Sequence, residues 1–147
     1  MQDDFDENEI VHGMYIHIVW STRNQMPVLD SIAQYLYQYI CDKALDLECH
    51  VIDGRAFNDH VQLIVKFNPH VSIDNLVKTL KDATSMLIRS NIPELKTFEW
   101  QQSEFFFTVS SEEACSIITT KAKPFKNEIC NILKQNGLNY KLKEVLL

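Results

Sequence analysis

A histidine and a glutamine interrupt an otherwise apolar stretch, NDHVQLIVKF, at residues 58–67. His60 and Gln62 are two positions apart, so a β-strand would place both on one face and Val61 and Leu63 on the other. An imidazole and a carboxamide on one face can share a hydrogen bond, and each can also be a ligand for a cation. Which chemistry applies depends on the elements that position this strand.

The length and composition of the chain suit one globular domain. It has 147 residues and a hydrophobic fraction of 46%, which can support an apolar core. No apolar run is long enough to span a bilayer, so we expect no membrane association. The four cysteines have no CxxC spacing, which argues against a zinc site or a disulfide framework and favours a cytoplasmic protein.

The charge is unevenly distributed along the chain. The formal net charge is −6, and five acidic residues within residues 1–9 leave the remainder near −1. We expect residues 1–12 to be a disordered acidic tail without a secretory signal, and residues 13–147 to form the domain. From residue 121 onward six lysines face two glutamates, which suits a phosphate partner, although a solubilising helix face is the simpler explanation.

Four segments have the β-branched and aromatic character of strands, namely residues 14–22, 49–57, 60–67 and 104–110. Helices are expected over residues 30–47, from Ser72 to before Pro93, over 111–120 and over 125–136. Ser72 is a suitable N-cap for the second helix, and Gly137 is a suitable stop for the last. The apolar stripe expected on the second helix consists of Ile73, Leu76, Leu80, Ala83 and Leu87.

This order predicts an α+β fold. The β-α-β-β-α-β arrangement is ferredoxin-like, with one antiparallel sheet, two helices on one of its faces and extra C-terminal helices. We expect Val61, Leu63 and Val65 to face the two helices, and His60 and Gln62 to lie on the other face. A partner, a substrate or the final helix must cover that second face.

Five segments resemble, in the same order, those of a known family. They are YIHIVWSTRNQMPVL (15–29), NDHVQLIV (58–65), VSIDNLVKTLKDATSMLI (71–88), FEWQQSEFFFTVS (98–110) and PFKNEICNILKQNGLNY (124–140). The chain is similar to the single-tyrosine transposases of small bacterial insertion sequences and to their relatives associated with repetitive palindromic DNA. These proteins belong to the HUH nuclease superfamily, so the resemblance implies the superfamily's fold.

The resemblance also implies a metal-dependent chemistry on single-stranded DNA hairpins, carried out by dimers. Two ligands from one strand hold Mg²⁺ or Mn²⁺ against the scissile phosphate, and a tyrosine forms a covalent phosphotyrosine link. His60 matches the first ligand, and Gln62 stands where the family has a second histidine. Because a carboxamide oxygen is a suitable but weaker ligand, the resemblance assigns His60 and Gln62 to a variant or vestigial metal site.

The segment that should carry the nucleophile departs from the family. Between the fourth strand and the last helix the chain reads SSEEACSIITTKAKP (110–124), which contains no Tyr, Gln or His. Ile117, Ile118 or Thr120 falls at the nucleophile position, and none of them can replace a phenol. The tyrosines of the first helix should lie across the sheet. Tyr15 is on the first strand and Tyr140 follows Gly137, and Tyr140 is the better of these two candidates.

The first hypothesis is therefore a transposase-like protein that binds single-stranded or hairpin DNA, or RNA, without cleaving it. One alternative is an active strand-transferase that uses Tyr140, and another is a dimeric protein-interaction scaffold without nucleic acid. Trp100 and Phe105 to Phe107 would either stack on bases or, more simply, form the core and a dimer interface. The cations expected to contact phosphate are Arg23, Arg55, Lys78, Lys81, Arg89, Lys121, Lys123 and Lys126.

Overall fold

The computed structural model of the chain describes residues 14–110, 113–114 and 123–138. The acidic tail expected over residues 1–12, most of the helix expected over 111–120, Lys121 and Tyr140 lie outside these ranges. No helix among the described residues is long and apolar enough to cross a lipid bilayer.

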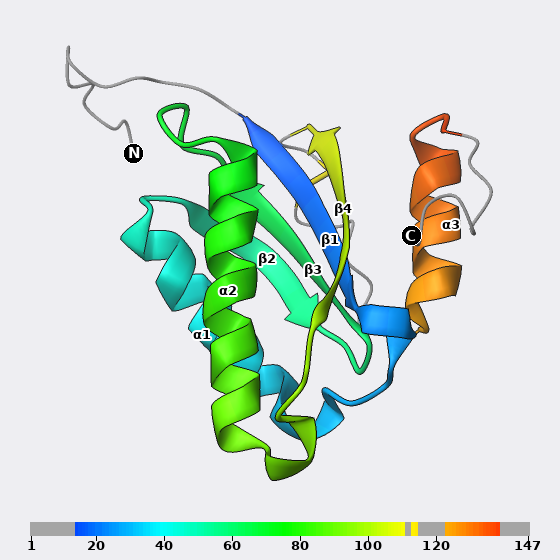
Figure 1. Cartoon of the computed structure of the whole chain (residues 1–147). Helices are drawn as coiled ribbons and strands as arrows, with labels where there is room; N and C mark the ends of the chain where they lie inside the picture. The colour runs from blue at the N-terminus through cyan, green and yellow to red at the C-terminus, as the bar shows by residue number, and fades with distance from the viewer. Residues whose placement is uncertain (1–13, 111–112, 115–122, 139–147) are drawn as a thin grey trace.

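An antiparallel sheet of four strands lies at the centre of the molecule, in the order β2-β3-β1-β4 (Figure 1). Its strands are Tyr15–Thr22 (β1), His50–Ala56 (β2), His60–Lys66 (β3) and Trp100–Val109 (β4). With α1 between β1 and β2, and α2 between β3 and β4, the chain has the β-α-β-β-α-β order predicted from the sequence. The α+β, ferredoxin-like class is thereby confirmed.

Strand β4 begins four residues earlier than the sequence predicts. Its first residues, WQQSE, are mostly polar and have little intrinsic strand preference. They nevertheless pair with β1, where Trp100 lies opposite Thr22 and Glu104 opposite Trp20, with a register shift between these two pairs. Pairing with a neighbouring strand therefore extends β4 beyond the segment that its own composition supports.

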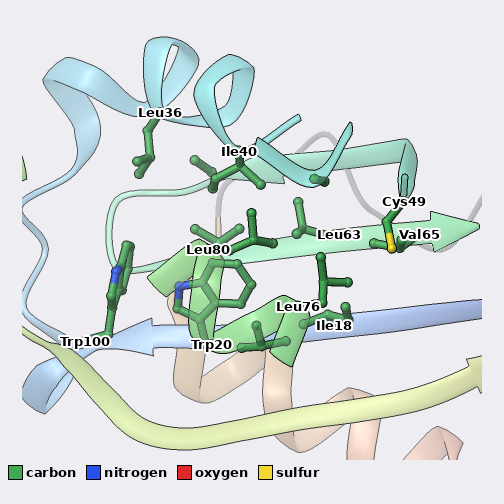
Figure 2. Close-up of a cluster of buried hydrophobic side chains, with 14 of the residues drawn as sticks. Ile18, Trp20, Leu36, Ile40, Cys49, Leu63, Val65, Leu76, Leu80 and Trp100 are labelled. Atoms are coloured by element: carbon green, nitrogen blue, oxygen red, sulfur yellow. The ribbon is translucent and has the colours of Figure 1, made fainter. Parts of the chain in front are cut away.

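Helices α1 (Ala33–Asp46) and α2 (Ile73–Asn91) cover one face of the sheet. Figure 2 shows the apolar core between them, in which Ile18 and Trp20 of β1 and Leu63 and Val65 of β3 meet the helices. The helices contribute Leu36, Ile40, Leu76 and Leu80 to this core. The face predicted for Val61, Leu63 and Val65 is confirmed.

The start of α2 is as predicted, but its buried stripe differs. Ser72 caps the helix by accepting a hydrogen bond from the Asn75 N–H at 3.0 Å. Thr84 and Ile88 are buried in place of Ala83 and Leu87, which are only partly buried. Thr84 can be buried because its hydroxyl donates to the Leu80 carbonyl at 2.7 Å and accepts from Trp100 Nε1 at 2.9 Å.

Helix α3 (Phe125–Gln135) lies on the opposite side of the sheet from α1 and α2 (Figure 1). It buries Phe125, Ile129, Ile132 and Leu133 against Val19, Phe105 and Phe107 of the sheet. Gly137 follows its end with a φ of 70°, a left-handed conformation that favours glycine, as the sequence predicts. The sequence left open whether a partner, a substrate or the final helix covers the second face of the sheet. In this part of that face it is the final helix.

Candidate functional site

His60 and Gln62 lie on the predicted face of β3, but both are buried. The exposed fraction is 0% for His60 and 1% for Gln62. The Phe57 ring stacks on the His60 imidazole at 4.4 Å between centroids, and the Phe125 ring lies 5.5 Å away in a tilted orientation. Apolar side chains therefore separate the pair from water.

The two side chains belong to a longer series of hydrogen bonds, which we call the polar chain (His17, Gln62, His60 and Asp59). His17 Nε2 donates to Gln62 Oε1 at 3.0 Å, and Gln62 Nε2 donates to His60 Nε2 at 3.2 Å. His60 Nδ1 donates to Asp59 Oδ1 at 2.7 Å. The other oxygen, Asp59 Oδ2, accepts from the backbone N–H of Phe125 at 3.1 Å.

These contacts indicate which nitrogen of the His60 ring donates and which accepts. A lone pair on His60 Nε2 accepts the Gln62 amide, so the ring proton is on Nδ1, where it meets the Asp59 carboxylate. Burial lowers the pKa of His17, and its hydrogen bond with Gln62 only partly opposes that effect. Burial therefore favours the neutral form of His17.

Asp59 joins the polar chain to α3. The first N–H groups of a helix lack intrahelical partners and lie at the positive end of its dipole. The Asp59 carboxylate satisfies one of them, that of Phe125, from a different part of the chain. The polar chain thus connects β1 and β3 to the N-terminus of α3.

The residues present do not fit Mg²⁺ or Mn²⁺ in this arrangement. The His60 nitrogen and the Gln62 oxygen that would bind a metal already accept hydrogen bonds from Gln62 and His17. Mg²⁺ also keeps several water ligands, whereas His60 and Gln62 are shielded from water. Among the described residues, no group of three His, Cys, Asp or Glu side chains could hold a metal. We therefore assign no chemical step to a metal at this site.

The tyrosines of α1 lie across the sheet from the polar chain, as predicted. The buried residues of α1 belong to the core shared with α2. Tyr35 is exposed on the surface of that helix. The Tyr37 ring packs beside Gly54, and burial raises the pKa of this phenol, which makes it a poor nucleophile.

An open groove of about 630 Å³ lies between α2 and the start of β4. Arg23, Lys78, Lys81 and Arg89, which are four of the eight cations predicted to contact phosphate, line this groove. Lys78, Ser85 and Arg89 recur at helical spacing along α2, so they share one side of the helix. Residues far apart in the sequence therefore form a single charged surface.

Each cation of the groove has a different local setting. Arg23 forms an ion pair with Glu99, and Lys81 pairs with Glu104 at 3.0 Å. Arg89 Nε donates to the Phe98 carbonyl at 2.8 Å, which leaves its terminal nitrogens at the surface. Lys78 is exposed, and no carboxylate within the described part of the chain pairs with it.

The other predicted cations are not brought to the groove. Arg55 on β2 lies over the Phe57 ring at 5.0 Å and lines a separate hollow. Lys123 lines another hollow near Asp59, and Lys126 is exposed on α3. Lys121 is outside the described residues.

The aromatic residues of β4 are mainly structural. Trp100, Phe105 and Phe107 are buried, which confirms the core part of the simpler interpretation, whereas the dimer interface stays a prediction. Phe106 is 39% exposed. Sequence reasoning missed His17 and Asp59, whose roles depend on strand register and on the position of α3.

Three comparisons with known proteins agree with this geometry. A family model described as "Transposase IS200 like" matches residues 10–122. ISDra2 transposase TnpA from Deinococcus radiodurans is 29% identical over 91 residues, which are 61% of this chain and 65% of that relative. The chain thus matches less than two thirds of that relative's length. A crystal structure described as that of a transposase from Deinococcus radiodurans R1 has the same fold, with a TM-score of 0.68 and 22% identity over 92% of this chain and 100% of that one.

Proposed function

Because the chain belongs to the IS200-like transposase family, we propose that it binds single-stranded or hairpin DNA through the groove between α2 and β4 and does not cleave it. The observation that carries this proposal is the convergence of Arg23, Lys78, Lys81 and Arg89 on one groove. Phosphate contacts from such cations supply most of the affinity of proteins for nucleic acid. We further propose that the protein acts as a homodimer in the cytoplasm. RNA is an alternative ligand, because it has the same phosphate backbone chemistry.

The dimensions of the groove suit a nucleic-acid backbone. Lys78 and Arg89 are eleven residues apart on α2, which corresponds to about 16 Å along the helix axis. Cations at that separation can contact more than one phosphate of the same strand. Gln101 and Gln102 also line the groove, and carboxamides are suited to hydrogen bonds with bases or sugars.

Two observations support the absence of cleavage. The interval from residue 110 to residue 124 offers no Tyr, Gln or His to act as nucleophile or ligand. The His60 and Gln62 atoms that would bind a metal are occupied by hydrogen bonds within the polar chain. DNA binding therefore lies on the α2 side of the sheet, whereas His60 and Gln62 on β3 have a structural role.

The groove is tested by titrating labelled DNA hairpins with groove variants and following fluorescence anisotropy. Lys78→Gln and Arg89→Gln should each weaken binding and reduce the salt dependence, by about 0.7 in log K against log salt for each lost phosphate contact. Lys66→Gln is the matched control, because Lys66 is exposed at the far end of β3. Equal affinities for all four proteins would contradict the assignment of the groove, and no binding by any of them would contradict DNA binding itself.

A further inference from the structure

The groove contains almost as many carboxylates as cations. Asp82, Glu99 and Glu104 line it together with its two arginines and two lysines. Carboxylates repel phosphate, so carboxylates at these positions weaken a surface whose only role is to bind phosphate. Two of them, Glu99 and Glu104, are paired with groove cations, which indicates that they control access to those cations.

Glu99 is held beside Arg23 by the backbone. The N–H of Arg23 donates to the Glu99 carbonyl at 3.1 Å, so the two side chains start from adjacent points. Their exposed fractions are 64% for Arg23 and 50% for Glu99. An ion pair this exposed is weak, because water and salt screen it. A phosphate can therefore displace Glu99 from Arg23, but it must compete with a carboxylate that is always nearby.

Glu104 holds Lys81 more firmly. The Lys81 side chain is 12% exposed and that of Glu104 is 25% exposed. Lys81 Nζ donates to the Gln101 carbonyl at 2.7 Å, to the Gln102 carbonyl at 3.5 Å and to Glu104 Oε1 at 3.0 Å. An ammonium group has three N–H donors, and these contacts engage two of them well and the third weakly, so Lys81 has little capacity left for a ligand while they persist.

We infer that Glu99 and Glu104 determine the specificity of the groove by competing with phosphate for Arg23 and Lys81. Lys78 and the terminal nitrogens of Arg89 are then the cations that meet a nucleic acid first. A nucleic-acid strand that binds only through its charge gains little affinity from the groove. A nucleic-acid strand that makes further contacts can displace Glu99 from Arg23. This inference rests on the proposed function, because it concerns the selectivity of the same groove.

The test compares Glu99→Gln, Glu104→Gln and the double variant with the unmodified protein, using a labelled hairpin and a labelled unstructured single strand. Each variant should bind the unstructured strand roughly two- to fivefold more tightly, as expected for removing a competing surface carboxylate. The slope of log K against log salt concentration for each variant should also become steeper by about 0.7 for each cation released to phosphate. The preference for the hairpin should fall.

Two controls separate this effect from a general change in charge. Asp42→Asn removes one negative charge from the exposed side of α1, away from the groove, and should leave binding unchanged. In an Arg23→Gln background, Glu99→Gln should have little further effect, because Glu99 acts through Arg23. Glutamine at position 104 keeps an oxygen that can accept from Lys81, but without the charge it holds the ammonium group more weakly than a carboxylate does. Glu99 is half exposed. Both variants should therefore fold, which a thermal melt would check.

The outcomes distinguish the inference from the proposed function. If the unmodified protein binds DNA but the glutamate variants match Asp42→Asn, the inference is overturned and the groove remains. If only the glutamate variants bind, the carboxylates block the groove instead of making it selective, and both the inference and the proposed function are overturned. If no protein binds either strand, both the inference and the proposed function are overturned.

Discussion

At the scale of single residues, Gln62 determines what the His60 position can do. A carboxamide carries both an acceptor and a donor, so Gln62 can bridge two imidazoles, His17 through its oxygen and His60 through its nitrogen. The sequence revealed the pair on β3 but not His17, which is 45 residues away. Only the register between β1 and β3 brings the third side chain into contact.

Replacing Gln62 by Leu should destabilise the protein strongly. Both imidazoles would lose a partner in a buried position, and each unsatisfied group costs about 1–3 kcal/mol. The free energy of unfolding should therefore fall by roughly 2–5 kcal/mol in urea denaturation. Ile64→Val is the matched control on the same strand and should cost about 0.5–1.5 kcal/mol. Equal losses for the two variants would show that the polar chain contributes little.

The lowered pKa of His17 predicts a pH dependence of stability. In the unfolded chain His17 has its ordinary pKa of 6.5, whereas burial lowers the pKa in the folded protein. The unfolded state then binds more protons below pH 6.5, so the stability present above that pH is lost as the pH falls. His17→Gln keeps a donor for Gln62 and should reduce the slope of unfolding free energy between pH 6.5 and 5. An unchanged slope would exclude His17 as its source.

At the scale of elements, α3 is held on the sheet by apolar packing and by the polar chain. Its apolar residues pack on Val19, Phe105 and Phe107, and its first N–H is bound by Asp59. The sequence predicted the helix and its end at Gly137 from local signals. It did not predict the contact between Asp59 and Phe125, because two residues 66 positions apart meet only after the sheet has formed.

Asp59→Ala should loosen the N-terminus of α3. A helix that loses a capping oxygen is typically destabilised by about 0.5–2 kcal/mol. Because Asp59 also accepts from the buried His60 Nδ1, the whole domain should lose some stability as well. Hydrogen–deuterium exchange should therefore accelerate most in the first turns of α3 and less in α2, which has its own cap at Ser72. Asp42→Ala, an exposed position on α1, should leave both helices unchanged. Uniform acceleration across α2 and α3 would indicate global destabilisation instead.

At the scale of the whole molecule, the sheet separates two different surfaces. The α2 side carries the groove with its paired cations, and the α3 side carries the buried polar chain. The order of elements and the family resemblance made the fold predictable. The hydrogen bonds from Lys81 to the Gln101 and Gln102 carbonyls were not predictable, since the sequence did not assign these two residues to a strand.

The most direct test of the account mixes the unmodified protein with labelled hairpin DNA and Mn²⁺, measures anisotropy at low and moderate salt, and then runs the same samples on a denaturing gel. We expect salt-sensitive binding, with intact DNA and no covalent protein–DNA band. A covalent band or cleaved DNA would contradict the account and would return attention to Tyr140, through Tyr140→Phe. An absence of binding in both buffers would instead favour the protein-interaction scaffold.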